Sequence, residues 1–321
     1  MAFIEYLQEP ELRSPVLVAA FGGWNDAADA ATTAIKFLVD QWKPLRFAQV
    51  DDEEFLLFTE TRPTIQFSKG SLRKVTWPGG RFFADTNPLR DHDIVLYLGP
   101  EPQLKWRTFI REFLEVCKHL RISEALLLGA FLANIPHSAT VPISGFASHP
   151  TLVERLSELD VRDSRYEGPT GIVGVLQDAF NQASIPSASL WAAAPHYLAA
   201  TPNIKVTAAL LTYLNTFLGT DLDLRDIQSD AVRFDEQITL LVERDPDARA
   251  YVRKLEERAN EEDENDDDDD ELDENEMVIH PDRAPGTGPL PSADMLIRSV
   301  EELLRSERQN QEPDSDTNED K

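Results

Sequence analysis

The sequence has very little cysteine and few basic residues. Cys117 is the only cysteine among 321 residues, which excludes an internal disulfide and a metal site built on several thiolates. Lys and Arg number 31 against 58 Asp and Glu, so the net charge is −27. A surface this acidic argues against binding to nucleic acid or to an anionic membrane. We therefore expect neither a nucleic-acid partner nor a bound metal.

Long apolar runs and catalytic signatures are also missing. No apolar run approaches the ~20 residues that span a bilayer, and the N-terminus lacks a basic segment followed by an apolar one. We therefore expect a soluble, cytoplasmic protein without a membrane partner. The sequence has no G-x-S-x-G elbow, no G-x-x-x-x-G-K-[ST] phosphate loop and no H-E-x-x-H pair. These absences count against an enzyme, and we expect no cofactor.

What the sequence does contain is an alternation of short apolar runs and amphipathic stretches. The opening unit begins as a strand near 15–21, passes through the Gly22-Gly23 turn and continues as an alanine-rich helix. Further strands are predicted at 45–50, 93–100, 124–130, 141–146 and 189–194, with helices at 103–120, 150–158 and after Thr170, and hairpins within 55–87. This order predicts a mainly parallel sheet covered on both faces, a three-layer α/β/α sandwich. Cys117 lies on the apolar face of its helix and is predicted to be a core residue.

The C-terminal part is predicted to be helical and then disordered. Helices are expected at 203–218, at 222–243 and from Asp245-Pro246 onward. The middle helix carries a seam that we expect to pack on its own domain rather than form a dimer zipper: Leu224, Ile227, Ala231, Phe234, Ile238 and Leu241. We divide the chain into a core domain (1–202), a helical subdomain (203–260), a disordered acidic and Pro/Gly linker (261–290), a short amphipathic helix (291–307) and a disordered tail (308–321).

The linker and the helix that follows it form a recognisable combination. Residues 261–276 contain 13 Asp and Glu and no Lys or Arg, so self-repulsion should extend them. Helical spacing then returns through Met295/Leu296, Ser299/Val300 and Leu303/Leu304. An amphipathic helix on a long tether is the form of a docking element, and it could equally fold back on its own core. The acidic run itself is read as a solvated tether, with a mimic of nucleic acid or a handle for a basic partner as the functional alternatives.

Polar residues follow several of the predicted strands, and the loops that carry them should converge on one edge of the sheet. The candidate cleft comprises Gly22, Gly23, Trp24, Asn25, Asp26, His137, Glu167, Gly168, Thr170, Gly171, His196 and Tyr197. Such a set could bind an anion, a sugar and a base. The alternative is structural, because Asn25, Asp26 and Thr170 stand at helix starts where side-chain oxygens cap free N–H groups. His196 could be a hydrogen-bonded structural histidine, and no residue is assigned a catalytic role.

Acidic residues also follow the second strand, at 51–54. The order of strand, glycine turn, helix, strand and acid is similar to a dinucleotide site. However, residues 21–26 lack the G-x-G-x-x-G spacing that such a site needs. An ordinary acidic loop is the alternative.

Three motifs carry a resemblance to a known family. They are Phe21-Gly22-Gly23-Trp24-Asn25-Asp26-Ala27, Tyr166-Glu167-Gly168-Pro169-Thr170-Gly171-Ile172 and Ala194-Pro195-His196-Tyr197. Together they resemble the bacterial, actinobacterial-type members of the proteasome assembly chaperone 2 family, over roughly residues 1–260. The resemblance implies an α/β/α sandwich related to nucleoside phosphorylases. The family's characterised eukaryotic members are chaperones that help proteasome α-subunits form rings.

One turn departs from that family pattern. Bacterial relatives often have a Pro-His-Thr-Arg-like turn where this chain has Pro136-His137-Ser138-Ala139. The missing arginine removes a potential anion ligand, which puts any anion site here in doubt.

Two hypotheses of function follow. The first is a chaperone-like protein-interaction scaffold, homo-oligomeric, that assists assembly of the proteasome or of another complex. The second is an enzyme acting on a nucleoside-like or phosphorylated small molecule at the strand-edge cleft. An enzyme predicts an open cleft lined with polar groups, whereas a scaffold predicts a cleft filled by Trp24 and Tyr197.

Overall fold

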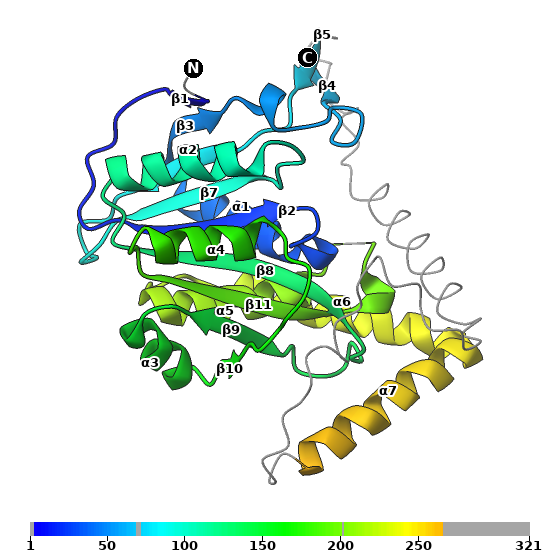
Figure 1. Ribbon diagram of the computed structural model, residues 1–321. Coiled ribbons are helices and arrows are strands. Elements are labelled where there is room, and N and C mark those ends of the chain that lie inside the picture. The colour runs from blue at the N-terminus through cyan, green and yellow to red at the C-terminus, as the bar shows by residue number, and fades with distance from the viewer. Residues whose placement is uncertain (1–2, 69–71, 201, 266–321) are drawn as a thin grey trace, which may run out of the picture.

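The computed structural model describes residues 3–68, 72–200 and 202–265 (Figure 1). Its strands are β1 (Ile4–Tyr6), β2 (Val16–Gly22), β3 (Leu45–Val50), β4 (Thr64–Ser68), β5 (Leu72–Thr76), β6 (Arg81–Asp85), β7 (Ile94–Pro100), β8 (Glu124–Ala133), β9 (Ile143–Ala147), β10 (Arg162–Asp163) and β11 (Ser187–Pro195). Its helices are α1 (Ala30–Trp42), α2 (Trp106–His119), α3 (Pro150–Glu158), α4 (Ile172–Gln182), α5 (Ile204–Leu218), α6 (Arg225–Arg244) and α7 (Pro246–Asn265). Short 3₁₀ turns are η1 (Ala27–Asp29), η2 (Asp52–Glu54) and η3 (His196–Leu198).

Nine of the strands form one sheet in the order β1-β3-β6-β7-β2-β8-β11-β9-β10. Its centre is parallel, because β7, β2, β8 and β11 all run the same way. The flanks are mixed, since β1, β3 and β6 pair antiparallel on one side and β9 pairs antiparallel with β11 on the other. The loop between β6 and β7 is too short for a crossover helix, so these neighbouring strands pair antiparallel. The parallel prediction therefore holds for the centre of the sheet.

Helices cover both faces of this sheet, which confirms the three-layer α/β/α fold. On the face toward the viewer of Figure 1, α2 and α4 pack on a cluster rich in aromatic residues that includes Phe21, Tyr97 and Phe113. On the other face, α1, α5 and α3 pack on an aliphatic cluster. Each face is held by burial of apolar surface, which contributes ~25 cal/mol per Å². Cys117 of α2 is 1% exposed, and burial raises the pKa of its thiol, as expected of a core residue.

The C-terminal helices continue from this second helical layer. α6 packs against α5, and α7 packs against α6 and extends away from the sheet (Figure 1). The third predicted helix does start at Asp245-Pro246, and Asp245 caps it, because its Oδ1 accepts from the backbone amide of Asp247 at 2.9 Å. The predicted α6 seam is buried within the chain, with Ile227 and Ala231 in the aliphatic cluster and Phe234 and Ile238 in a third cluster shared with α7.

Three details differ from the sequence predictions or lie outside the described residues. β4 and β5 do form a hairpin, but β6 joins the main sheet instead of a second hairpin. Residues 69–71, between β4 and β5, are outside the described residues. α7 continues to Asn265, past the predicted linker boundary at 260. The rest of the linker, the predicted helix at 291–307 and the tail at 308–321 are also outside them. None of the helices described here is long and apolar enough to cross a membrane.

Candidate functional site

The twelve residues predicted to share one cleft lie in two places. Gly22 to Asp26 and Glu167 to Gly171 gather where β2 and β7 end and α4 begins. His137, His196 and Tyr197 lie under α6 and α7 instead. The prediction of one cleft is corrected because the C-terminal helices cover the ends of β8 and β11.

A glutamate that the sequence analysis did not single out joins the segments at the first place. Glu101 follows β7, and its Oε1 accepts from Nδ2 of Asn25 at 2.7 Å and from the backbone amide of Ile172 at 2.7 Å. It thereby caps α4 from a strand that is distant in sequence. Asn25 is completely buried, and its Oδ1 has no partner among the described residues. A Cβ on Gly171 would meet that Oδ1 at 2.1 Å, so the glycine makes room for the carboxamide.

Two of the proposed caps have different outcomes. Asp26 is a cap, because its Oδ1 accepts from the amide of Ala31 at 2.7 Å and its Oδ2 accepts from the hydroxyl of Thr32 at 2.5 Å. Burial raises the pKa of Asp26 to about 6. Thr170 is not a cap, because α4 begins after Gly171 and no side chain of a neighbouring residue caps it. The capping oxygen comes from Glu101. Asp26 and Asn25 are therefore engaged with their own chain.

Beside this junction lies an open cavity of about 860 Å³, which we call the aromatic groove. Its floor is the part of the sheet that α4 leaves uncovered, and its walls are the Gly23–Trp24 turn, the 163–167 segment and α4. The rings that line it are Trp24, Phe131, Phe146, Tyr166 and Trp191. Trp24 is 40% exposed and Phe146 is 45% exposed. Four of the twelve predicted residues line this groove: Gly23, Trp24, Glu167 and Thr170.

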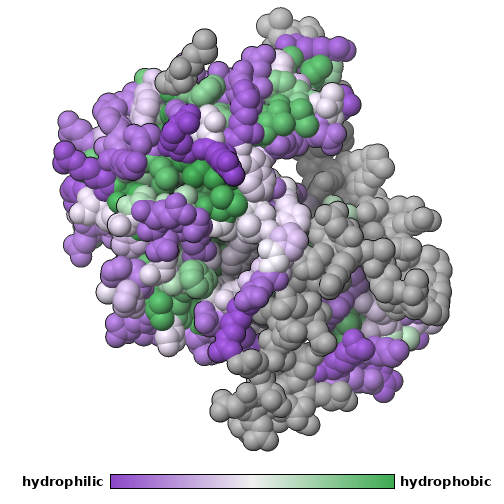
Figure 2. All heavy atoms as spheres, viewed as in Figure 1, coloured by the Kyte–Doolittle hydropathy of each residue, from purple (hydrophilic) through white to green (hydrophobic). Residues whose placement is uncertain are grey.

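The groove exists because small residues stand beneath it. Trp191 of β11 lies directly opposite Gly129 of β8. A Cβ on Gly129 would come within 2.4 Å of the indole ring, so only glycine lets this ring lie on the neighbouring strand. Ser144 and Ser189 also line the floor and fill little space. Figure 2 shows green apolar patches on this side of the molecule, separated by purple hydrophilic residues.

The second place is a cluster of rings that fastens the C-terminal helices to the core; we call it the histidine–tyrosine cluster. It contains His137, His196, Tyr197 and Tyr251. Tyr197, which is 1% exposed, accepts from the amide of His137 at 2.6 Å and donates to Nδ1 of the same residue at 2.8 Å. Nε2 of His137 contacts the hydroxyl of Thr239 in α6 at 3.1 Å. His196 reaches α7 through the hydroxyl of Tyr251 at 2.9 Å.

The acids after β3 also have structural partners. Asp51 is the N-cap of η2, and Oδ1 of Asp52 accepts from the amide of Gly80 at 3.3 Å. Burial raises the pKa of Asp52 to about 7. Neither carboxylate lies in the aromatic groove. These contacts favour an ordinary acidic loop over a dinucleotide site.

A comparison with models of known families identifies the family of this chain. The model of the PAC2 family matches residues 20–242, more than half of the chain. The chain belongs to the PAC2 family. The resemblance found in the three sequence motifs is thereby confirmed.

Solved structures of other PAC2 proteins agree. A PAC2 family protein from Streptomyces avermitilis is 40% identical, with a TM-score of 0.67; the match covers 74% of this chain and 99% of that one. A proteasome-assembly chaperone homologue from Mycobacterium tuberculosis is 39% identical, with a TM-score of 0.66 and the same coverage. An archaeal proteasome activator from Pyrococcus furiosus shares the fold alone, at 17% identity, a TM-score of 0.61 and coverage of 74% and 97%. The comparison with curated proteins gave no match.

The PAC2 match ends within α6, so α7 lies beyond it. The histidine–tyrosine cluster therefore joins PAC2-matched residues to a helix outside the match. Besides Tyr251, α7 supplies Glu256, whose Oε1 accepts from the hydroxyl of Ser138 at 2.7 Å. Sequence reasoning missed this cluster because nothing in the spacing of α7 indicates which strand ends it covers.

We expect acidification to weaken the attachment of α7 in this PAC2 protein. Burial lowers the pKa of His137 and of His196 below the ordinary value of 6.5. A histidine whose pKa is lower when α7 is docked binds its proton more readily once α7 has detached. Above the pKa of the detached state the docked state keeps its full stability, and this stability is lost as the pH falls below that pKa. Hydrogen exchange of α7, corrected for intrinsic rates, should therefore be faster at pH 5.5 than at pH 7.5.

Two histidine variants test this prediction. Replacing both His137 and His196 with Asn should remove the pH dependence of exchange. His119→Gln is the matched control, because His119 is half-exposed on α2 and distant in the fold from α7. Equal protection of α7 at both pH values in the unaltered protein would contradict the prediction.

Proposed function

We propose that this PAC2 protein is a chaperone-like scaffold that binds proteasome subunits, or the subunits of another complex, in the cytoplasm. The aromatic groove is the observation that carries the proposal. An open groove lined by exposed Trp and Phe rings matches the composition of protein interface centres, where aromatic anchors dominate the binding energy. The 39%-identical relative described as a proteasome-assembly chaperone homologue supports the choice of partner.

The polar groups of the predicted cleft favour a binding role over catalysis. Asn25 and Asp26, together with Glu101, hydrogen-bond within their own chain, and His137 and His196 fasten α6 and α7. A general acid or base must reach the substrate's proton, either directly or through one water. In the arrangement seen here these groups support the fold around the groove.

The groove itself matches neither simple expectation. It is open and polar residues such as Asp163, Glu167 and Gln177 line it, as expected for an enzyme. Five aromatic rings also line it, which an interface centre would share. Trp24 borders the groove without closing it, and Tyr197 lies in the histidine–tyrosine cluster. A partner's side chains could therefore enter between the rings.

The rival proposal is an enzyme that binds a nucleoside-like or phosphorylated small molecule. One observation favours it: a volume of about 860 Å³ falls in the range of small-molecule sites. Two tryptophans, Trp24 and Trp191, offer faces on which a base could stack. Native mass spectrometry of the full chain purified from its own host separates the proposals. A small bound mass favours the enzyme, and a protein subunit at fixed stoichiometry favours the scaffold.

A binding assay with variants then tests the groove. The full chain is titrated with purified proteasome α-subunits of its host, and complex formation is followed by native mass spectrometry. Trp24→Ala together with Phe146→Ala should weaken binding at least about tenfold, because buried aromatic anchors contribute most of an interface's energy. Leu89→Ala is the control, since Leu89 is 92% exposed and outside the groove. If the unaltered protein, the double variant and the Leu89→Ala control bind equally well, the groove is not the binding site.

We also propose that the protein self-associates through the β4–β5 hairpin. The hairpin is a separate two-stranded sheet, which is marginally stable on its own in water. Ile65 and Phe67 of β4 share one face with Val75 of β5, and the three are 59%, 73% and 46% exposed. Trp77, which follows β5, is 57% exposed. Figure 2 shows green surface at the top of the molecule, where Figure 1 places this hairpin.

Self-association through the hairpin predicts a change in oligomer mass. Phe67→Ser with Trp77→Ser should shift the full chain toward monomer and raise the dissociation constant at least about tenfold. Light scattering after size-exclusion chromatography measures the mass across protein concentrations. Leu89→Ser should leave the mass unchanged. A monomeric unaltered protein, or an oligomer that persists in the hairpin variant, would refute this surface.

A further inference from the structure

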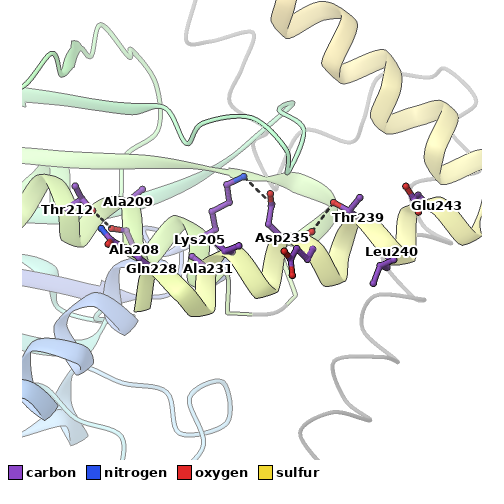
Figure 3. A pocket seen from close by; sticks show the side chains of 12 residues that line it. Lys205, Ala208, Ala209, Thr212, Gln228, Ala231, Asp235, Thr239, Leu240 and Glu243 are labelled. Atoms are coloured by element: carbon purple, nitrogen blue, oxygen red, sulfur yellow. Dashed lines mark hydrogen bonds and ion pairs between the residues drawn. The ribbon is translucent and has the colours of Figure 1, made fainter. Parts of the chain in front are cut away.

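A second groove runs along the outer side of α5 and α6, away from the aromatic groove. We call it the α5–α6 groove; its volume is about 740 Å³. Its apolar lining includes Ala208 and Ala209 of α5 and Val232 and Leu240 of α6. Figure 3 shows α5 and α6 side by side, with Lys205 and Asp235 paired between them at one point of the groove.

α6 therefore has two apolar stripes. Ile227, Phe234 and Ile238 face the core and are at most 8% exposed. Val232 and Leu240 face the α5–α6 groove and are 59% and 55% exposed. Exposed apolar surface that is continuous along a helix groove is typical of a contact surface. A helix laid along the groove would cover it with residues at a spacing of three and four.

We propose that the occupant is the predicted amphipathic helix at 291–307 of the same chain. Its apolar positions, Met295/Leu296, Val300 and Leu303/Leu304, recur at the spacing that such a groove accepts. An isolated helix of this length is marginal in water. Burial of its apolar face against Val232 and Leu240 would stabilise it.

The charged residues of the predicted helix face away from the groove. Arg298 lies two residues from Leu296 and from Val300, and Arg305 lies two residues from Leu303. Residues two apart lie on opposite sides of a helix, so both arginines stay in solvent when the apolar face is buried. The contact with the groove is therefore made by the apolar residues.

The tether is long enough for this contact within one chain. α7 begins directly after α6, and its length of 20 residues corresponds to ~30 Å. Residues 266–290 then span up to ~80 Å when extended. Their acidic composition favours extension through self-repulsion. A segment tethered at this distance has an effective concentration near the millimolar range, so modest contacts suffice for docking.

Hydrogen exchange of the full chain tests the proposal. Residues 291–307 should exchange at least about tenfold more slowly than an unstructured peptide, and Val232→Asp with Leu240→Asp should abolish that protection. Both residues are more than half exposed, so the fold should tolerate the change. Val153→Asp is the matched control, because Val153 is an apolar residue of α3 that is 51% exposed. Exchange of 291–307 at the unstructured rate in the unaltered protein overturns the proposal.

Cross-linking identifies the occupant. With Leu240→Cys and Leu303→Cys, mild oxidation should give a cross-link within one chain. Cys117 is buried and should not interfere. A cross-link that forms only between two chains would mean that a second copy occupies the groove, which also overturns the proposal.

Discussion

Replacing Glu101 with alanine is expected to lower the free energy of unfolding by about 3 kcal/mol. Two losses add. The fully buried Nδ2 of Asn25 loses the acceptor that satisfies it, and the amide of Ile172 at the start of α4 loses its cap. Thermal unfolding should show this as a decrease in Tm of roughly 6–12 °C for a domain of this size.

Two further variants separate this effect from a loss of charge. Glu101→Gln keeps an oxygen that can accept both hydrogen bonds, so it should recover most of the lost stability. Glu115→Ala removes an exposed glutamate of α2 and should change the Tm little, because exposed ion pairs contribute 0–1 kcal/mol. If the Glu101→Ala protein has the same Tm as the Glu115→Ala control, Glu101 does not support α4.

Gly129→Ala is expected to cost about 2–3 kcal/mol in the free energy of unfolding. The new Cβ would lie 2.4 Å from two atoms of the Trp191 ring, and a ring held between strands cannot move aside without displacing its neighbours. The indole would have to tilt into the aromatic groove. We therefore expect a lower Tm and, if the groove binds a protein partner as proposed, weaker binding of that partner.

A double-mutant cycle isolates the contact between these two residues. If the clash with the ring is the cause, Gly129→Ala should cost little in a protein that already carries Trp191→Leu. Gly22→Ala is the steric control, since a Cβ there would be 3.6 Å from its nearest neighbour, an ordinary contact. The same loss of stability with and without the indole would point to the strand backbone instead.

The individual strands and helices were predictable because each depends on the pattern of a short stretch of sequence. A doubly buried strand such as β2 appears as a continuous apolar run, and the apolar stripe of α2 repeats every three to four residues. The antiparallel flanks were harder, because strand direction depends on which strands become neighbours. β6 illustrates this, since it belongs between β3 and β7 although it follows β5 in sequence.

The candidate site was predicted in part, for a physical reason. The rule that loops after parallel strands meet at one edge correctly brought the Gly23–Trp24 turn toward Glu167 and Thr170. It failed for His137 and Tyr197, because α6 and α7 pack over that end of the sheet edge and bury the loops there. Glu101 had a usable signal, an acid directly after a buried strand. Phe131 and Trp191 had none, since a ring in a strand is equally typical of a core.

The bond from Glu101 to Ile172 has a consequence for the order of folding. It joins positions 71 residues apart, so α4 can be capped only after β7 has joined the sheet, and contacts of long sequence separation form slowly. The floor of the aromatic groove also needs β11, which ends at Pro195. A growing chain therefore has no groove until most of the core has been synthesised. If the groove binds a partner as proposed, that partner can be captured only late in synthesis.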